Sequence, residues 1–331
     1  MVDFSGRSCL VTGATGFLGS HLVAALVEHG ARVRCLVRST SRRDFLPTLG
    51  VELVTGDVTI PESLPSAVDD VDYVFHLAGL IKASDPADYF RVNYLGTIAL
   101  LEACRSRARQ LQRVLIVSSL AAAGPSAPGR PVTESWPCRP VTPYGKSKLL
   151  AEQAASAYVS ELPITIIRPP TIYGPRDRET LLLFRLVALG IRPHLPVRGE
   201  ISIVHATDLV TGILLAATHP AATGETFFIA GDEILSFDEV ISHLARAVGR
   251  QGLTVPVPRW AVRASARAAE IMREVAGISL VFDRWKAVEI LEGYWACSNE
   301  RARRLLGFAP RIRVADGLAA TAHWYRAAGW L

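Results

Sequence analysis

The sequence predicts an α/β fold in which a doubly wound parallel sheet is joined to a smaller α/β lobe at the C-terminal end. Two observations in the first half of the chain support this: short apolar runs alternate with helical patterns, and a glycine-rich turn follows the first run. After about Pro175 the alternation fades into helical patterns joined by proline-rich connections. Alternating strands and helices are typical of parallel sheets covered by helices on both faces.

Each strand is predicted by a short apolar run that ends at a turn or a polar stretch. We expect strands at residues 8–12, 32–37, 51–55, 71–77, 113–117 and 164–167. Apolar residues at helical spacing predict the helices between them, at residues 17–29, 90–107 and 144–159. In the C-terminal part, the same pattern predicts helices at residues 179–189, 237–248 and 259–275.

Composition and charge exclude several classes of function. The chain has 331 residues and a net charge of +5, but its basic residues are scattered and lack a nucleic-acid recognition motif, so we expect no nucleic-acid partner. Its five cysteines are widely spaced without a C-x-x-C pair, so we expect neither a disulfide framework nor a metal site. There is no signal-peptide pattern and no apolar run of membrane-spanning length, and we expect a cytoplasmic protein without a membrane span.

The glycine-rich turn lies between the first expected strand and the first expected helix. Its residues are Gly13-Ala14-Thr15-Gly16-Phe17-Leu18-Gly19. Glycines allow a tight turn and let backbone N–H groups approach a pyrophosphate, while the N-terminus of the helix adds a partial positive charge. Three glycines at this spacing, between a strand and a helix, predict a dinucleotide-binding site.

The end of the second expected strand bears on the choice of dinucleotide. An acidic residue there would bind the ribose 2′-hydroxyl of NAD. This chain has Arg38 instead, followed by hydroxyl residues and by Arg42 and Arg43. Cations and hydroxyls suit a 2′-phosphate through charge-assisted hydrogen bonds, so we favour NADP over NAD.

Tyr144 and Lys148 lie four residues apart near the start of an expected helix. This spacing places them on one face, one helical turn apart. A free phenol has a pKa near 10, and a nearby ammonium group lowers it by stabilising the phenolate. Tyr144 is therefore predicted to exchange a proton with a substrate oxygen.

Together these motifs resemble the extended short-chain dehydrogenase/reductase superfamily, over nearly the whole chain. Further stretches that carry the resemblance are Gly56-Asp57-Val58, His76-Leu77-Ala78-Gly79, Asn93 with Gly96-Thr97, Val117-Ser118-Ser119, and Arg168-Pro169-Pro170-Thr171-Ile172-Tyr173-Gly174-Pro175. The block around His205 and Asp208 and the ending Leu305-Leu306-Gly307-Phe308-Ala309-Pro310 also match.

The resemblance implies a dinucleotide-binding Rossmann domain at residues 1–174 plus roughly 203–230, and a substrate-binding lobe at 175–202 and 231–331. It implies catalytic roles for Ser119, Tyr144, Lys148 and Asn93, with Ser119 preferred over Ser118 because Gly124 follows it by five residues. It also implies a homodimer through the helices that follow Phe90 and Tyr144. The expected cofactor contacts are Gly13, Thr15, Gly16, Phe17, Leu18, Gly19, Arg38, Asp57, Val58, Leu77, Ala78, Gly79, Tyr144, Lys148, Pro169, Thr171 and Ile172.

Departures from the family patterns distinguish the possible reactions. Dehydratases of the family carry Asp-Glu after the Ser or Thr, where this chain has Leu120-Ala121, and removal of a hydroxyl needs such a general acid. Nucleotide-sugar epimerases have Asn where this chain has Thr171, and Arg where it has Ile201. In those epimerases, the Asn and the Arg normally hold the sugar diphosphate.

The stretches after Ser118 and Arg168 look more like the branch that contains 3β-hydroxysteroid dehydrogenases and dihydroflavonol reductases. We therefore predict hydride transfer between the nicotinamide and a carbonyl or secondary alcohol of an apolar small molecule. A nucleotide-sugar epimerase with tightly bound NAD is the alternative. A third possibility is a non-catalytic member that senses its cofactor.

Overall fold

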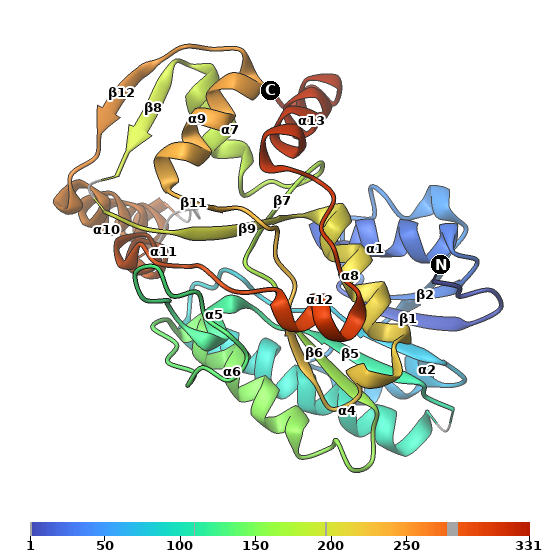
Figure 1. The fold of residues 1–331 in the computed structure, drawn as a ribbon. Helices are drawn as coiled ribbons and strands as arrows, with labels where there is room; N and C mark the ends of the chain where they lie inside the picture. Colours follow the sequence, from blue (N-terminus) through green and yellow to red (C-terminus); the bar gives the residue numbers. More distant parts are fainter. Residues whose placement is uncertain (1, 109, 196, 277–283) are drawn as a thin grey trace.

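A parallel sheet forms the centre of the larger lobe. The computed structural model describes residues 2–108, 110–195, 197–276 and 284–331, and Figure 1 shows their arrangement. Within these residues, seven strands form the sheet in the order β10-β6-β5-β4-β1-β2-β3, and each neighbouring pair is parallel. The strands are β1 (Ser8–Thr12), β2 (Arg32–Val37), β3 (Glu52–Thr55), β4 (Tyr73–His76), β5 (Arg113–Val117), β6 (Ile164–Arg168) and β10 (Thr226–Phe228).

Helices cover both faces of this sheet, as the alternating pattern predicts (Figure 1). One face packs against α1 (Phe17–Glu28), α8 (Ala206–Thr218) and α12 (Glu300–Leu306), which contribute apolar side chains to one buried cluster. The other face packs against α2 (Pro65–Val68), α4 (Gly96–Arg107) and α6 (Pro143–Ser156). The predicted doubly wound α/β fold is confirmed.

Strand β10 is the part of the sheet that the sequence did not predict. The chain enters the second lobe after β6, then returns through β9 (Ile201–His205), α8 and the short η4 (Pro220–Ala222) to place β10 beside β6. The three residues of β10 are too few to show the alternation of apolar and polar residues that predicts a strand. The return of residues 203–230 to the large sheet agrees with the interleaved division expected from the sequence, and that division stays a prediction.

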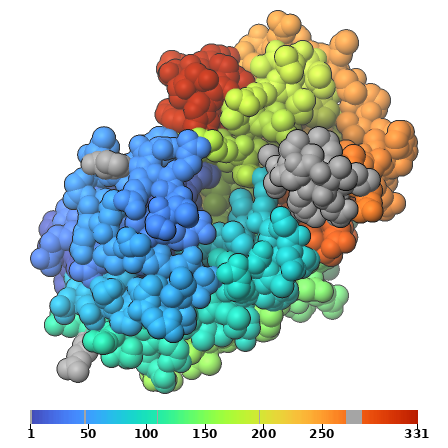
Figure 2. All heavy atoms as spheres, turned by 180° about the vertical axis from the view of Figure 1, so that it is seen from behind, coloured from blue at the N-terminus to red at the C-terminus, as the bar shows by residue number. Residues whose placement is uncertain are grey.

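The second lobe is built on small sheets and amphipathic helices. Strands β11 (Ile234–Leu235), β9 and β7 (Thr171–Tyr173) form one sheet, and β12 (Leu253–Pro256) pairs with β8 (Ile191–His194). The helices are α7 (Leu181–Ala188), α9 (Phe237–Val248), α10 (Arg259–Ala276), α11 (Arg284–Glu292) and α13 (Val314–Ala327). Figure 2 shows this lobe, in yellow-green, orange and red, beside the blue and cyan N-terminal half.

The helix expected at residues 90–107 differs from the prediction at its start. It begins earlier, with α3 (Pro86–Tyr89), and passes through a π-helical segment, η3 (Phe90–Leu95), before it continues as α4. Wide turns of this kind occur often at functional sites. The remaining short elements are η1 (Pro47–Leu49), η2 (Pro61–Ser63) and α5 (Leu120–Ala123).

No helix among the described residues is long and apolar enough to cross a membrane. The exposed side chains of Leu95 and Leu150 lie on η3 and α6, the helices through which a homodimer is expected. The homodimer and the cytoplasmic location stay predictions.

Candidate active site

The glycine-rich turn needs glycine for steric reasons that the structure makes explicit. Gly13 has a φ of +70°, and a Cβ there would lie 2.7 Å from the backbone nitrogen of Ala78. A Cβ on Gly19 would lie 2.1 Å from the carbonyl oxygen of Gly13. The turn is closed by a hydrogen bond of 3.0 Å from the Gly16 N–H to the same carbonyl. Larger residues at either position would open the turn.

The N-terminus of α1 fits an anionic ligand such as a pyrophosphate. Gly16 is the residue that precedes this helix, and it has no side chain to cap the free N–H groups of the first turn. The first turn also has no acidic residue. Thr15, Phe17 and Leu18 flank these N–H groups, so the predicted loop contacts lie together at one helix end with its partial positive charge.

Several other predicted residues lie at the same edge of the sheet. Arg38 follows β2, Leu77-Ala78-Gly79 follows β4, Ser119 follows β5 and Pro169 follows β6. Because the strands are parallel, their carboxyl ends meet along one edge, where α/β proteins bind their ligands. Thr171 and Ile172 continue from there into β7.

Asp57 and Val58, two of the expected cofactor contacts, follow β3. Asp57 accepts hydrogen bonds from the Thr59 N–H at 2.8 Å and from the Thr59 hydroxyl at 2.9 Å. Val58 is buried against α4 and would contact a side chain on Gly96. These contacts fix the conformation of the turn that follows β3.

A buried hydrogen-bonded chain connects β1, β4 and α4 through His76. The Thr97 hydroxyl donates to the carbonyl of Asn93 at 2.7 Å, so it accepts from the His76 Nε2–H at 2.9 Å. His76 Nδ1 then accepts from the Thr12 hydroxyl at 2.8 Å, and Thr12 Oγ1 accepts from the Ala78 N–H at 3.1 Å. This order requires a neutral imidazole. Burial lowers the pKa of His76 to about 3, helped by the charge of Lys148.

The Asn93 side chain joins α6 to the turn after β4. Its Oδ1 accepts from the Leu80 N–H at 2.7 Å, and its Nδ2 donates to the Leu80 carbonyl at 3.0 Å. Nδ2 also donates to Ser147 Oγ at 2.9 Å, and Ser147 donates in turn to the Tyr144 carbonyl. Asn93 therefore positions the first turn of α6 through its backbone. Its predicted catalytic role stays a prediction, and these contacts make it a positioning residue.

Lys148 is buried beside the same turn. Its Nζ donates to the Val117 carbonyl at 2.9 Å and lies 3.2 Å from where a Cβ on Gly79 would be. A side chain at position 79 would therefore displace the ammonium group. Burial lowers the pKa of Lys148 to about 8, and the Glu152 carboxylate opposes this shift.

Tyr144 and Ser119 face each other at the end of β5. Thr142 caps α6 by accepting from the Gly145 N–H at 3.1 Å, which places Tyr144 in the first turn. The Ser119 side chain acts to lower the pKa of the phenol, and its Oγ accepts a hydrogen bond from the Ala121 N–H at 3.1 Å. The hydroxyl of Ser118 is buried without a hydrogen-bond partner among the described residues, and the choice of Ser119 stays a prediction.

We expected Lys148 to lower the pKa of Tyr144, but in the structure this pKa is raised. Burial raises the pKa of Tyr144 to about 12, and the nearby Ser119 side chain opposes this shift only in part. Desolvation disfavours the phenolate, and the Lys148 ammonium is engaged by a carbonyl. Tyr144 is therefore a protonated phenol at neutral pH.

Sequence reasoning missed the residues from other parts of the chain that surround Tyr144 and Lys148. The Tyr89 ring lies 6.0 Å from the Tyr144 ring, centre to centre, and the Glu289 carboxylate of α11 interacts electrostatically with Tyr144. Glu152, one turn after Lys148, forms a buried ion pair with Arg168 at 2.5 Å. Arg168 was recognised as part of a motif, but no local pattern indicated its partner.

Acid should destabilise the protein through its buried histidines. The pKa of His76 is about 3 and that of His205 about 4, both lowered chiefly by burial, against about 6.5 in the unfolded chain. Because the unfolded chain binds these protons first, stability falls as pH drops below 6.5. For His76 the loss is about 2 kcal/mol between pH 7 and pH 5.

The measurement is the free energy of unfolding in denaturant at pH 7 and pH 5. His76→Gln should reduce the pH-dependent loss by about the contribution of one histidine. His323→Gln, on the exposed side of α13, serves as the control and should keep the wild-type difference. An unchanged pH difference in His76→Gln would contradict the assignment.

Comparisons with known proteins bear on this geometry. A family model described as the NAD dependent epimerase/dehydratase family matches residues 9–230. A ceramide reductase of Caulobacter vibrioides is 33% identical over 322 residues, which cover 97% of this chain and 95% of that protein.

Two solved structures are similar over nearly their whole length. The crystal structure of gox2253 has a TM-score of 0.82 and 28% identity, and the match covers 98% of this chain and all of that one. MoeE5 in complex with UDP-glucose and NAD has a TM-score of 0.75 and 28% identity, with 97% and 99% of the two chains covered.

Proposed function

The chain belongs to the NAD-dependent epimerase/dehydratase family, and on this premise we propose that it reduces a carbonyl group of an apolar small molecule with a nicotinamide cofactor. It is an enzyme of the extended short-chain dehydrogenase/reductase type. The observation that carries the proposal is the placement of Tyr144 in the first turn of α6, Ser119 after β5 and the buried Lys148, whose ammonium group donates to the Val117 carbonyl, at the carboxyl edge of the sheet.

The protonation state of Tyr144 suits reduction. With a pKa of about 12 the phenol holds its proton at neutral pH and can donate it to the oxygen of a carbonyl group. The nicotinamide supplies the hydride when it is bound, and that hydride forms the new C–H bond. Ser119 donates a hydrogen bond to the same oxygen, which stabilises its developing negative charge. The product is a secondary alcohol, and the Tyr144 phenolate regains a proton from solvent.

Apolar residues where related dehydratases have acids support a reductase. Leu120 and Ala121 are both buried in α5, directly after Ser119. Elimination of a hydroxyl needs an acid near these positions. The ceramide reductase of Caulobacter vibrioides also supports a substrate with a large apolar part.

We propose NADP as the cofactor rather than NAD. The Arg38 side chain is exposed after β2 and forms no ion pair with another residue in the described part of the chain. Arg42, by contrast, pairs with Asp44 at 3.5 Å. An unpaired guanidinium at the end of the second strand suits a 2′-phosphate.

A nucleotide-sugar epimerase remains the alternative because MoeE5 is similar in structure and is solved with UDP-glucose and NAD. Thr171 and Ile201 argue against it, since neither side chain carries the amide or cation that holds a sugar diphosphate in such epimerases. Ile201 instead pairs with Leu235 in the small sheet.

The two reactions differ in net cofactor turnover. A reductase should release its nucleotide on purification and oxidise added NADPH continuously when an apolar ketone is supplied, as measured by absorbance. An epimerase should retain NAD, detectable by mass measurement after denaturation, and should show no net oxidation of NADPH.

In the same assay of NADPH oxidation, Arg38→Gln should raise the KM for NADPH about tenfold and leave the KM for NADH unchanged. Arg107→Gln, exposed in the last turn of α4, is the matched control.

A further inference from the structure

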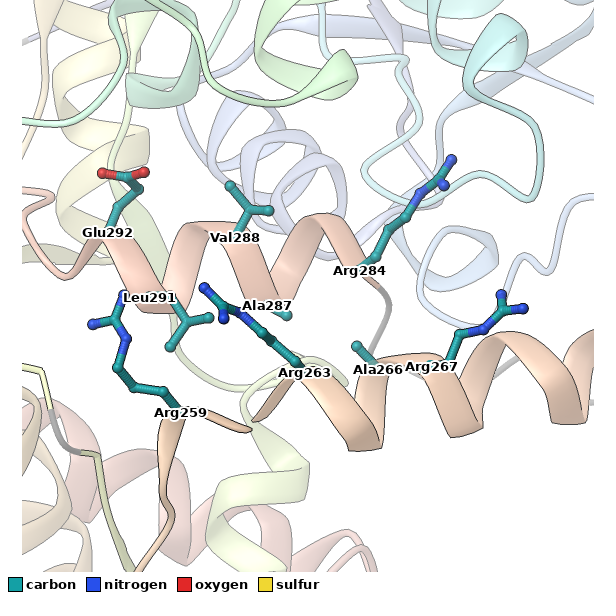
Figure 3. Close-up of a pocket in the computed structure, with 9 residues that line it drawn as sticks. All are labelled: Arg259, Arg263, Ala266, Arg267, Arg284, Ala287, Val288, Leu291 and Glu292. Atoms are coloured by element: carbon teal, nitrogen blue, oxygen red, sulfur yellow. The ribbon is translucent and has the colours of Figure 1, made fainter. Parts of the chain in front are cut away.

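A second concave site lies in the C-terminal lobe between α10 and α11. Figure 3 shows this pocket, which has a volume of about 350 Å³. Charged side chains from both helices line it: Arg259, Arg263 and Arg267 from α10, and Arg284 and Glu292 from α11. The volume is in the range of small-ligand sites.

Two of the lining arginines lie one turn apart on α10. A spacing of four residues places Arg259 and Arg263 on one face of the helix, where neighbouring like charges repel each other. Arg259 and Arg263 form no ion pair with any residue that the structure describes. Some arginines elsewhere are paired, as Arg34 is with Glu52 and Arg301 with Glu225.

The floor of the pocket is apolar. Ala266 and Ala287 are buried there, and Val288 and Leu291 complete the lining between the charged groups. A guanidinium group binds phosphate and carboxylate through a planar pair of N–H donors. A purely polar anion would leave the apolar floor without a partner.

We propose that this pocket binds the phosphate or carboxylate end of an amphipathic molecule. The anionic group lies between Arg259 and Arg263, and the first part of the hydrocarbon chain covers Ala266 and Leu291. Glu292 at one side disfavours a second negative charge there, so the ligand carries its charge at one end.

The pocket is separate from the proton-transfer site, and the proposal does not rest on the proposed function. Arg284, Ala287, Val288 and Leu291 share one face of α11 by their helical spacing. Glu289, which interacts with Tyr144, is turned away from that face. Helix α11 therefore has the pocket on one side and the catalytic tyrosine toward another.

Calorimetric titration with octyl phosphate and with inorganic phosphate tests the proposal. Octyl phosphate should bind at one site per chain, and inorganic phosphate more weakly because it leaves the floor uncovered. Arg263→Gln should weaken octyl phosphate binding about tenfold or more, since charge-assisted hydrogen bonds are lost. Because Arg263 is exposed, this change should leave the fold intact. Arg304→Gln, exposed on α12, is the matched control and should bind as the wild type does.

The outcomes decide both the site and the source of its ligand. Absence of saturable binding, or equal losses in Arg263→Gln and Arg304→Gln, would overturn the proposal. Sedimentation with phosphatidic acid vesicles, compared with phosphatidylcholine vesicles, distinguishes a lipid headgroup from a free amphipathic phosphate. Vesicle binding that depends on Arg263 indicates the lipid source. Vesicle binding that survives Arg263→Gln counts against the pocket as the lipid site.

Discussion

Tyr144→Phe is expected to lower kcat/KM for carbonyl reduction by roughly 10²- to 10⁴-fold, the usual contribution of a positioned general acid. The phenol carries a proton that Phe lacks, and the Thr142 cap of α6 places it in the first turn of that helix. Phe retains the ring, so its packing against Tyr89 is preserved. The measurement is the steady-state rate of NADPH oxidation with a confirmed ketone substrate.

A matched variant separates the loss of the proton from a general disturbance. Tyr94→Phe removes a hydroxyl from a partly buried tyrosine of η3 and should keep wild-type activity. NADPH binding, followed by fluorescence, should be unchanged in both variants, because the expected loss is in proton transfer. If Tyr144→Phe turned over its substrate at the wild-type rate, the catalytic assignment would be wrong.

Glu152→Met should cost roughly 3–5 kcal/mol of unfolding free energy, because it leaves the buried guanidinium of Arg168 without its counter-charge. The pair is two-pronged: Arg168 Nε donates to Glu152 Oε1 at 3.0 Å, and Nη2 donates to Oε2 at 2.5 Å. Both side chains are less than a tenth exposed. Because Glu152 is on α6 and Arg168 ends β6, the pair also fixes α6, the helix that carries Tyr144 and Lys148, against the sheet.

A double variant tests whether the cost comes from the unpaired charge. Glu152→Met combined with Arg168→Met should be more stable than either single variant, since replacing both partners removes the buried charge. Glu161→Met, in a half-exposed pair with Arg105, should change the unfolding free energy by no more than about 1 kcal/mol. Additive losses in the double variant would contradict this account. Chemical denaturation at pH 7 provides all four values.

The local patterns were sufficient for most of the larger lobe. The periods of apolar residues predicted β1, α1 and β2 to within a residue at their ends. These signals are local, because a helix or strand shows its buried face in its own sequence. The strand expected at 71–77 is shorter, at Tyr73–His76, and the helix expected at 144–159 runs from Pro143 to Ser156. Such ends depend on capping and neighbours rather than on the period.

The sequence alone predicted the glycine turn, the spacing of Tyr144 and Lys148 and the choice of Ser119, and the catalytic roles of these residues stay predictions. Each of these predictions uses residues that lie within seven positions of one another in the sequence: the glycines of one turn, two residues one helical turn apart, and a serine with a glycine five residues later. The tertiary structure decided the remainder, because those relations join residues far apart in the chain. It paired Glu152 with Arg168 and linked Thr12, His76 and Thr97 into one buried chain. It also raised the pKa of Tyr144 by burial, which no spacing of charges along one helix shows.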